Sequence, residues 1–157
     1  MSVNAAGKES MVVFPLGDRR FALPTADVVE LSRPGVIQTF PHTTPGMMGV
    51  LVRRGEVLPV WDVARALVGT DDATQKYFLV VRRNFAGSEP TALLISGECQ
   101  MLNAEVMPPP EGAAAHARGL LWLEGEAVEV IDLGRLVSPL GQSDRPTLEA
   151  AKEGEQA

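Results

Sequence analysis

The sequence predicts an all-β fold built from small barrels, and three observations support this prediction. Short apolar runs follow one another closely, separated by glycine, proline and aspartate residues that favour turns. No stretch keeps the helical period of about 3.6 residues for long enough to predict a long helix. A segment of the first half also returns in the second half, which predicts two similar, strand-rich units.

The first half is expected to be a series of strands joined by tight turns. Residues 11–24 predict a β-hairpin around a Gly-Asp pair, because both residues tolerate the left-handed backbone of such a turn. Residues 27–34 continue as an extended segment that ends at a Pro-Gly pair. Residues 44–49 predict a short helix or turn, and residues 50–61 predict two strands around an Arg-Gly pair.

The second half is expected to repeat this organisation after a short helix at residues 62–68. Asp62 stands where a carboxylate can cap free N–H groups, and Gly69 ends the helix. Strands are then predicted at residues 76–83, 91–97 and 99–106, a proline break at 107–112, and a strand-turn-strand-helix unit at 119–138.

Length and composition predict one soluble, globular domain with loose ends. The chain has 157 residues, of which 45% are hydrophobic and 22% charged, which is typical of a globular protein. We expect residues 1–10 to be a flexible tail, 11–141 the folded domain, and 142–157 an acidic tail or frayed helix. The N-terminus lacks the apolar stretch of a signal peptide, and no apolar run could span a membrane. A cytoplasmic protein without direct membrane insertion is therefore expected.

The internal repeat is clearest between two segments that begin at Gly49 and Gly119, an offset of 119 − 49 = 70 residues. At this offset seven residues of the first segment meet identical residues in the second: Gly49, Leu51, Gly55, Glu56, Val60, Asp62 and Arg65. A weaker match aligns Leu23 with Leu94, at an offset of 71. The repeat predicts two intertwined barrel subdomains; chance similarity between strand-glycine-strand segments is the alternative.

No constellation of residues predicts catalysis, a metal or a cofactor. Asp62 and Asp132 lie at equivalent positions of the repeat and together resemble a pair of catalytic carboxylates. Each precedes a predicted helix, however, where capping explains it. His42 and His116 have no partner at a metal-ligand spacing. Cys99 is the single cysteine, which excludes an intrachain disulfide and favours a small buried hydrophobe.

The segment GVLVRRGEVLPVWDVARAL resembles the signature of CheW-like domains, with a glycine-led strand, an Arg-Gly turn, a Val-x-Pro-Val-type strand and an aspartate before a short helix. The resemblance extends back through FPLGDRRFALPTADVVEL and forward to MPPP and IDLGRL, and covers about residues 11–140. It implies two side-by-side five-stranded SH3-like barrels with short helices, to which the tail can add a frayed C-terminal helix.

The resemblance also implies a function and a set of binding residues. CheW-like proteins are non-catalytic scaffolds between chemoreceptors and a CheA-type histidine kinase, and they contact the kinase regulatory domain and the receptor's cytoplasmic tip. Arg54 matches the arginine that the family ties to receptor coupling, and Glu30 matches an acidic position linked to partner binding. Gly55, Val52 and Met48 complete the set of expected partner-binding residues.

Two departures from the family pattern leave the partners open. Val52 replaces an asparagine that the family often has, and Ser96-Gly97-Glu98 follows Ile95 where the family usually has Val-Asp-x-Val. A diverged scaffold of a pilus-motility array, or of another non-flagellar array, is therefore the alternative function. A small nucleic-acid-binding barrel is a remote alternative. A stripe formed by Arg53, Arg54, Arg82 and Arg83 would support it, but the net charge of −6 and the 5% aromatic content argue against it.

Three further side chains carry expectations about their surroundings. Arg53 should point to the face of its strand opposite Arg54 and lie on the surface. Trp61 and Trp122 should fill a barrel core or the seam between the halves, with an interface anchor as the alternative.

Overall fold

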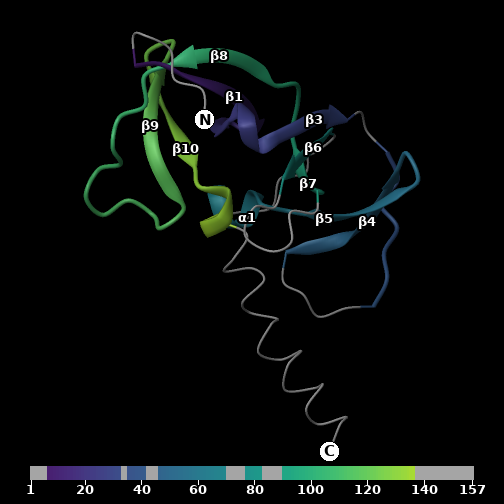
Figure 1. The fold of residues 1–157 in the computed structure, drawn as a ribbon. Coiled ribbons are helices and arrows are strands. Elements are labelled where there is room, and N and C mark those ends of the chain that lie inside the picture. Colours follow the sequence, from purple (N-terminus) through teal and green to yellow (C-terminus); the bar gives the residue numbers. More distant parts are fainter. Residues whose placement is uncertain (1–6, 33–34, 42–45, 70–76, 83–89, 137–157) are drawn as a thin grey trace, which may run out of the picture.

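The chain forms two five-stranded sheets that lie side by side (Figure 1). The computed structural model describes residues 7–32, 35–41, 46–69, 77–82 and 90–136. Its strands are β1 (Glu9–Leu16), β2 (Arg19–Pro24), β3 (Val28–Ser32), β4 (Met47–Arg53), β5 (Glu56–Trp61), β6 (Tyr77–Arg82), β7 (Pro90–Ile95), β8 (Gln100–Ala104), β9 (Ala117–Leu123) and β10 (Glu126–Ile131). Among the described residues the named helical elements are the 3-10 turn η1 (Thr25–Asp27) and α1 (Ala64–Val68), and residues 133–136 are also helical. The predicted all-β fold is confirmed.

The two sheets draw on both halves of the chain. The terminal sheet has the order β8-β1-β2-β10-β9, and the central sheet has the order β3-β6-β7-β5-β4. The chain therefore leaves the terminal sheet after β2, completes the central sheet, and then returns. In each sheet one parallel pair, β2 with β10 or β5 with β7, joins strands from different halves. Neither half could form its sheet alone, because each sheet needs strands from both.

The repeated segments form two β-hairpins with the same backbone, β4–β5 and β9–β10. Gly49 pairs with Val60, and Gly119 pairs with Val130. Next to each of these pairs, at the open end of the hairpin, the strand register shifts. Each hairpin closes with a two-residue turn whose residues both have positive φ, at 51° and 80° in one hairpin and 52° and 81° in the other. Positive φ at both positions is the mark of a type I′ turn, which suits the twist of the strands.

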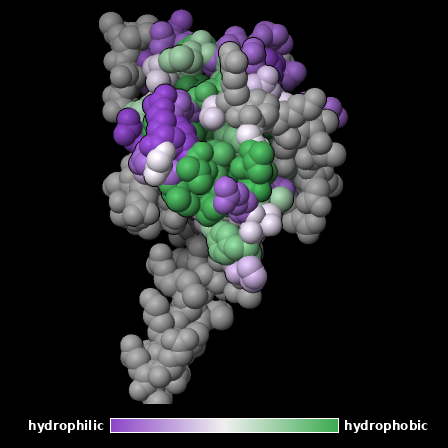
Figure 2. All heavy atoms as spheres, turned by 90° about the vertical axis from the view of Figure 1, so that its right-hand side faces the viewer, coloured by the Kyte–Doolittle hydropathy of each residue, from purple (hydrophilic) through white to green (hydrophobic). Residues whose placement is uncertain are grey.

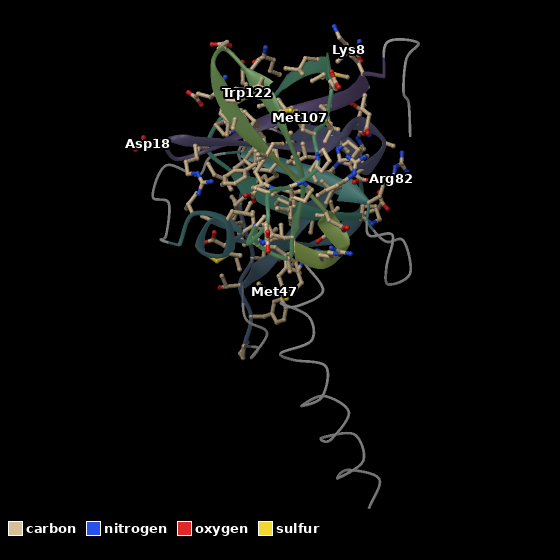
Figure 3. The ribbon with its side chains drawn as sticks, turned by 90° about the vertical axis from the view of Figure 1, so that its left-hand side faces the viewer. Lys8, Asp18, Met47, Arg82, Met107 and Trp122 are labelled. Atoms are coloured by element: carbon tan, nitrogen blue, oxygen red, sulfur yellow. The ribbon has the colours of Figure 1, made fainter. Side chains whose placement is uncertain are left out.

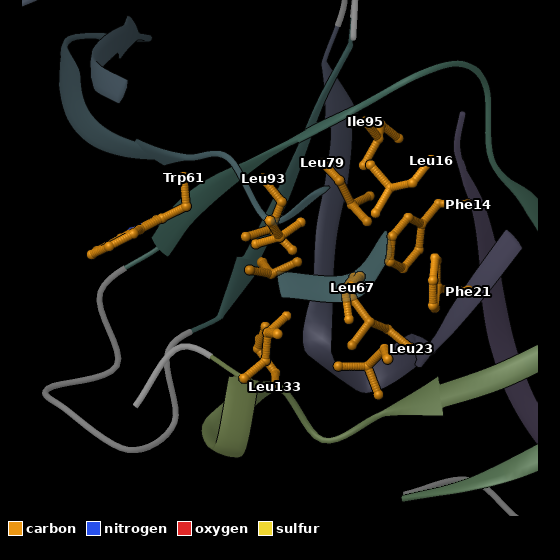
Figure 4. Packing of buried hydrophobic residues seen from close by; sticks show 14 of the residues in the cluster. Phe14, Leu16, Phe21, Leu23, Trp61, Leu67, Leu79, Leu93, Ile95 and Leu133 are labelled. Atoms are coloured by element: carbon orange, nitrogen blue, oxygen red, sulfur yellow. The ribbon is translucent and has the colours of Figure 1, made fainter. Parts of the chain in front are cut away.

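Three hydrophobic clusters hold the sheets together. One cluster fills the terminal sheet around Met11 and Leu121, and another fills the central sheet around Leu51 and Phe78. The largest cluster lies between the sheets and includes Phe14, Phe21, Trp61, Leu67, Leu93 and Ile131 (Figure 4). Residues 21–24 of β2 and 92–95 of β7 are buried on both faces, so these stretches are continuously apolar rather than alternating.

The expectation of a short helix or turn at residues 44–49 holds only for the turn at Gly46, and residues 44–45 lie outside the described residues. Residues 47–49 belong to β4, since Gly49 pairs with β5 and lets the segment at Gln38 cross close to its backbone. The expectation that Trp122 fills a barrel core or the seam is wrong. Trp122 is 62% exposed, because strand alternation places it on the outer face while Leu121 points inward. Trp61, in contrast, is buried between the sheets as predicted.

The capping prediction for the two aspartates is confirmed. Oδ1 of Asp62 accepts a hydrogen bond from the backbone N–H of Ala64 at 3.0 Å. Oδ1 of Asp132 accepts one from the N–H of Arg135 at 3.2 Å. None of the helices among the described residues is long and apolar enough to cross a membrane. The expectations for His42, Arg83 and the tail 142–157 lie outside the described residues.

Candidate partner-binding surface

The candidate surface lies where the tip of the β4–β5 hairpin meets β3. β3 and β4 are the two edge strands of the central sheet, and the curvature of this sheet brings its edges together. The bridge between Gln38 and Val50 closes the gap further, with N···O distances of 2.8 and 2.9 Å. Glu30 on β3 thereby reaches the arginines at the hairpin tip, although 23 residues separate it from Arg53 in the sequence.

Glu30, Arg53 and Arg54 form one ion-pair cluster. Nε and Nη2 of Arg53 both donate to Oε1 of Glu30. Nη2 of Arg54 lies 3.6 Å from Oε2 of the same carboxylate. Arg53 also approaches Glu56, with 3.8 Å between Nη1 and Oε1. The expected binding residues Glu30 and Arg54 are therefore brought together, but a third residue makes the closer contacts.

The expectation that Arg53 is only a surface residue is wrong. Its side chain is 13% exposed, whereas that of Arg54 is 75% exposed. Strand alternation could have revealed this, because Arg53 shares the inward face of β4 with the buried Leu51. A charged side chain on an inward face needs an oppositely charged partner close by, and Glu30 is that partner.

The charge state of Glu30 follows from this geometry. The hydrogen bond from Arg53 is the main cause that lowers the pKa of the Glu30 carboxyl, and partial burial opposes it. The positive charges of Arg53 and Arg54 lower this pKa further. Glu30 therefore stays ionised well into the acid range, and the cluster persists at neutral pH.

An apolar strip runs along the outer face of the hairpin, next to the ion-pair cluster. Val52 and Val57 are cross-strand partners and are 52% and 62% exposed. Behind them, the half-buried Val50 and Pro59 form the next outward pair. Figure 2 shows this side of the molecule, with hydrophobic residues gathered at its centre and a hydrophilic group beside them. Such a combination of apolar area and a charged rim is typical of protein interfaces.

The remaining expected residues occupy different parts of this surface. Gly55 completes the turn after Arg54, where its φ of 80° favours glycine. Met48 lies at the opposite end of β4 and is 41% exposed. It sits at the register shift between Met47 and Gly49, and bulges commonly re-aim side chains. Val57 belongs to the same strip but was missed in the sequence, because only the pairing register reveals that it faces Val52.

The second hairpin carries a different set of side chains at the same positions. Glu124 and Gly125 form its turn, and Arg20 reaches Glu124 and Glu126 at 3.6 and 3.3 Å. Trp122 borders a groove of about 330 Å³, together with Lys8, Asn103, Ala104, Glu105 and Met107. Figure 3 shows Trp122, Met107 and Lys8 on this side of the molecule.

Among the described residues, no group of three His, Cys, Asp and Glu side chains could hold a metal ion. Burial raises the pKa of the Cys99 thiol to about 11, so this side chain is almost wholly protonated at neutral pH. The candidate surface presents an exposed guanidinium and adjoining apolar side chains.

Fold and surface together define the class, a double-barrel β protein with an exposed hairpin that combines apolar and charged side chains. Residues 10–107 match the family model of the CheW-like domain. The chain is 30% identical over 151 residues to Protein FrzA of Myxococcus xanthus, which covers 90% of this chain and 93% of that protein. The chain therefore belongs to the CheW-like domain family.

Two further similarities agree with this membership. A probable chemotaxis protein CheW of Rhizobium etli is 28% identical over 143 residues, covering 84% of this chain and 89% of that protein. The crystal structure of the scaffolding protein TtCheW from Thermoanaerobacter tengcongensis superposes with a TM-score of 0.70 over 82% of this chain and 87% of that one. At 20% identity this second likeness concerns the fold, and it supports the predicted pair of barrels.

Proposed function

We propose that this protein is a non-catalytic adaptor that couples chemoreceptors to a CheA-type histidine kinase in the cytoplasm, at membrane receptor arrays. The observation that carries the proposal is the exposed Arg54 guanidinium beside the Val52–Val57 strip. These residues lie where the family resemblance expects a partner-binding surface, and Glu30 joins them there.

The geometry suits recognition of an acidic and apolar partner surface. The guanidinium of Arg54 presents a planar set of donors that fits a carboxylate in a bidentate manner. Val52 and Val57 supply the apolar contact that strengthens such a pair by excluding water. We assign the receptor's helical tip to this surface and the kinase regulatory domain to a barrel face or edge. The adaptor would then favour one arrangement of its partners and shift the kinase between states without any chemistry of its own.

A diverged, non-flagellar array is the second candidate, and Val52 is the observation that favours it. An exposed valine at a position where the family often has asparagine replaces a polar contact with an apolar one. The Ser96-Gly97-Glu98 departure also has a local structural role. Oγ of Ser96 accepts a hydrogen bond from the N–H of Gly17 at 2.8 Å, and the N–H of Ser96 donates to Pro15 at 3.0 Å.

Calorimetry with two purified probes tests the proposal: a CheA-type regulatory domain and a chemoreceptor cytoplasmic-tip fragment. Wild-type protein should bind both. Arg54→Glu should weaken binding of the receptor fragment by about tenfold or more, because it replaces attraction by repulsion at an interface. Glu124→Arg, at the equivalent turn of the other hairpin, is the matched control and should bind this fragment like wild type. Undiminished receptor binding by a folded Arg54→Glu variant would contradict the assignment.

A further inference from the structure

The two neighbouring arginines at the β4–β5 tip are used in opposite ways. Arg53 makes two contacts with one oxygen of Glu30 and is almost buried. Arg54 approaches the other oxygen of Glu30 only at 3.6 Å and is mostly exposed. The carboxylate is therefore held by the first arginine, and the second arginine remains accessible.

Backbone conformation explains this division. Arg53 is the last residue of β4 and directs its side chain toward the inner face of the barrel end. Arg54 is the first turn residue, with a φ of 51°, and this turn directs its side chain away from the sheet. The two side chains approach Glu30 from different directions and contact different oxygens.

Without Arg53, the nearest cation to Glu30 in this cluster would be Arg54. A flexible, exposed guanidinium 3.6 Å from an uncompensated carboxylate would turn toward it, because the attraction between unlike charges rises as the distance falls. Arg54 would then be bound within the molecule and unavailable to another protein. Arg53 prevents this by satisfying Glu30 first.

We propose that Arg53 is the positioning residue of this surface: it occupies Glu30 and so leaves Arg54 available to a carboxylate of the partner. The proposal rests on the proposed function and deepens it, since it specifies an acidic side chain as the group that the hairpin tip recognises. The second hairpin lacks this pair of arginines, because Leu123 and Glu124 stand at the positions of Arg53 and Arg54.

The first test needs no partner. The pKa of the Glu30 carboxyl is measured by NMR titration in wild type, in Arg53→Ala and in the double variant Arg53→Ala with Arg54→Ala. Arg53→Ala should leave this pKa below that of an ordinary glutamate, because Arg54 then pairs with Glu30, and only the double variant should raise it to the ordinary value. A rise to the ordinary value in Arg53→Ala alone would overturn the proposal, because Arg54 would then not be captured by Glu30.

The second test measures the affinity for the receptor cytoplasmic-tip fragment. Arg53→Ala should weaken binding by about three- to fivefold, the range expected when one exposed ion pair competes with another. Arg53→Lys should recover part of the loss. The double variant Arg53→Ala with Glu30→Gln should bind the fragment at least about twofold more tightly than Arg53→Ala alone, because no carboxylate then captures Arg54. A double variant as weak as Arg53→Ala would overturn the proposal, since Arg53 would then act by direct contact or by shaping the hairpin.

The control is a variant of the other hairpin, and binding by wild type separates failure of the positioning role from failure of the proposed function. Arg20→Ala removes the ion pairs at the tip of the other hairpin and should leave affinity for this fragment unchanged. Failure of wild type to bind the fragment contradicts the proposed function itself. Binding by wild type, with Arg53→Ala equally tight, contradicts only the positioning role.

Discussion

The β4–β5 and β9–β10 hairpins share one backbone but present different surfaces. Their glycines, turns, strand registers and capping aspartates coincide at a spacing of 70 residues. Their outward and tip residues differ: one hairpin carries valines and arginines, and the other carries Trp122 and glutamates. The shared positions are those that the backbone geometry constrains. The differing positions are free of that constraint, so they are where partner recognition can be encoded.

The largest expected effect separates the two tryptophans. Trp61→Ala should lower the free energy of unfolding by about 3–5 kcal/mol, because it empties the cluster between the sheets. Trp122→Ala, on the outer face of the other hairpin, should change it by less than about 0.5 kcal/mol. Urea unfolding measures both. Equal losses would contradict the assignment of Trp61 to the seam and Trp122 to the surface.

The next effect tests what the two hairpins share. A Cβ on Gly49 would lie 2.4 Å from the carbonyl oxygen of Gln38, and one on Gly119 would lie 2.5 Å from that of Met107. Gly49→Ala and Gly119→Ala should each cost about 2–4 kcal/mol, because each must separate a pair of backbone hydrogen bonds. Gly35→Ala is the control, since its Cβ would meet side-chain atoms only at 3.6 Å. If only one hairpin tolerated alanine, the contacts of Gly49 with Gln38 and of Gly119 with Met107 would not be equivalent.

A smaller effect tests the Glu30–Arg53–Arg54 ion-pair cluster of the first hairpin. The lowered pKa of Glu30 means that its contribution to stability is present above the pKa of an unfolded glutamate and is lost as the pH falls through the folded value. Glu30→Gln should therefore be less stable than wild type by about 1 kcal/mol at pH 7, and the difference should vanish in acid. Unfolding in urea between pH 7 and pH 3 measures it.

Asp27 provides the opposite sign as a control for that experiment. Burial is the main cause that raises the pKa of its carboxyl, with the charge of Asp132 adding and that of Arg118 opposing. The stability linked to this group is present at low pH and is lost as the pH rises through the raised pKa. Relative to wild type, Asp27→Asn should therefore gain stability with rising pH. Equal slopes for the two variants would show that neither carboxylate behaves as its surroundings require.

The last prediction concerns the reactivity of Cys99, with no expected change of stability. With a thiol pKa of about 11, its reaction with a disulfide reagent at pH 8 should be on the order of a hundredfold slower than that of a free cysteine. Unfolding in urea should restore the rate. Rapid modification of the native protein would show that this part of the chain opens readily.

Sequence reasoning succeeded where a local pattern carried the information. Turn glycines, strand alternation and the aspartate before each helix predicted the strands and caps, and the family resemblance included both Glu30 and Arg54 among the expected partner-binding residues. It failed for Arg53 and Trp122, although strand alternation places Arg53 on the face of Leu51 and Trp122 on the face opposite Leu121. The contact between Arg53 and Glu30 could not be predicted, because it depends on which strands become the edges of the central sheet, a long-range pairing that no single segment reveals.

The most direct test of the adaptor surface is hydrogen exchange with the receptor cytoplasmic-tip fragment bound. We expect new protection of backbone amides at residues 50–57 in wild type, little change at residues 120–127, and loss of the protection in Arg54→Glu. Protection confined to residues 120–127, or unchanged by Arg54→Glu, would contradict the claim that the first hairpin is the one that recognises the receptor.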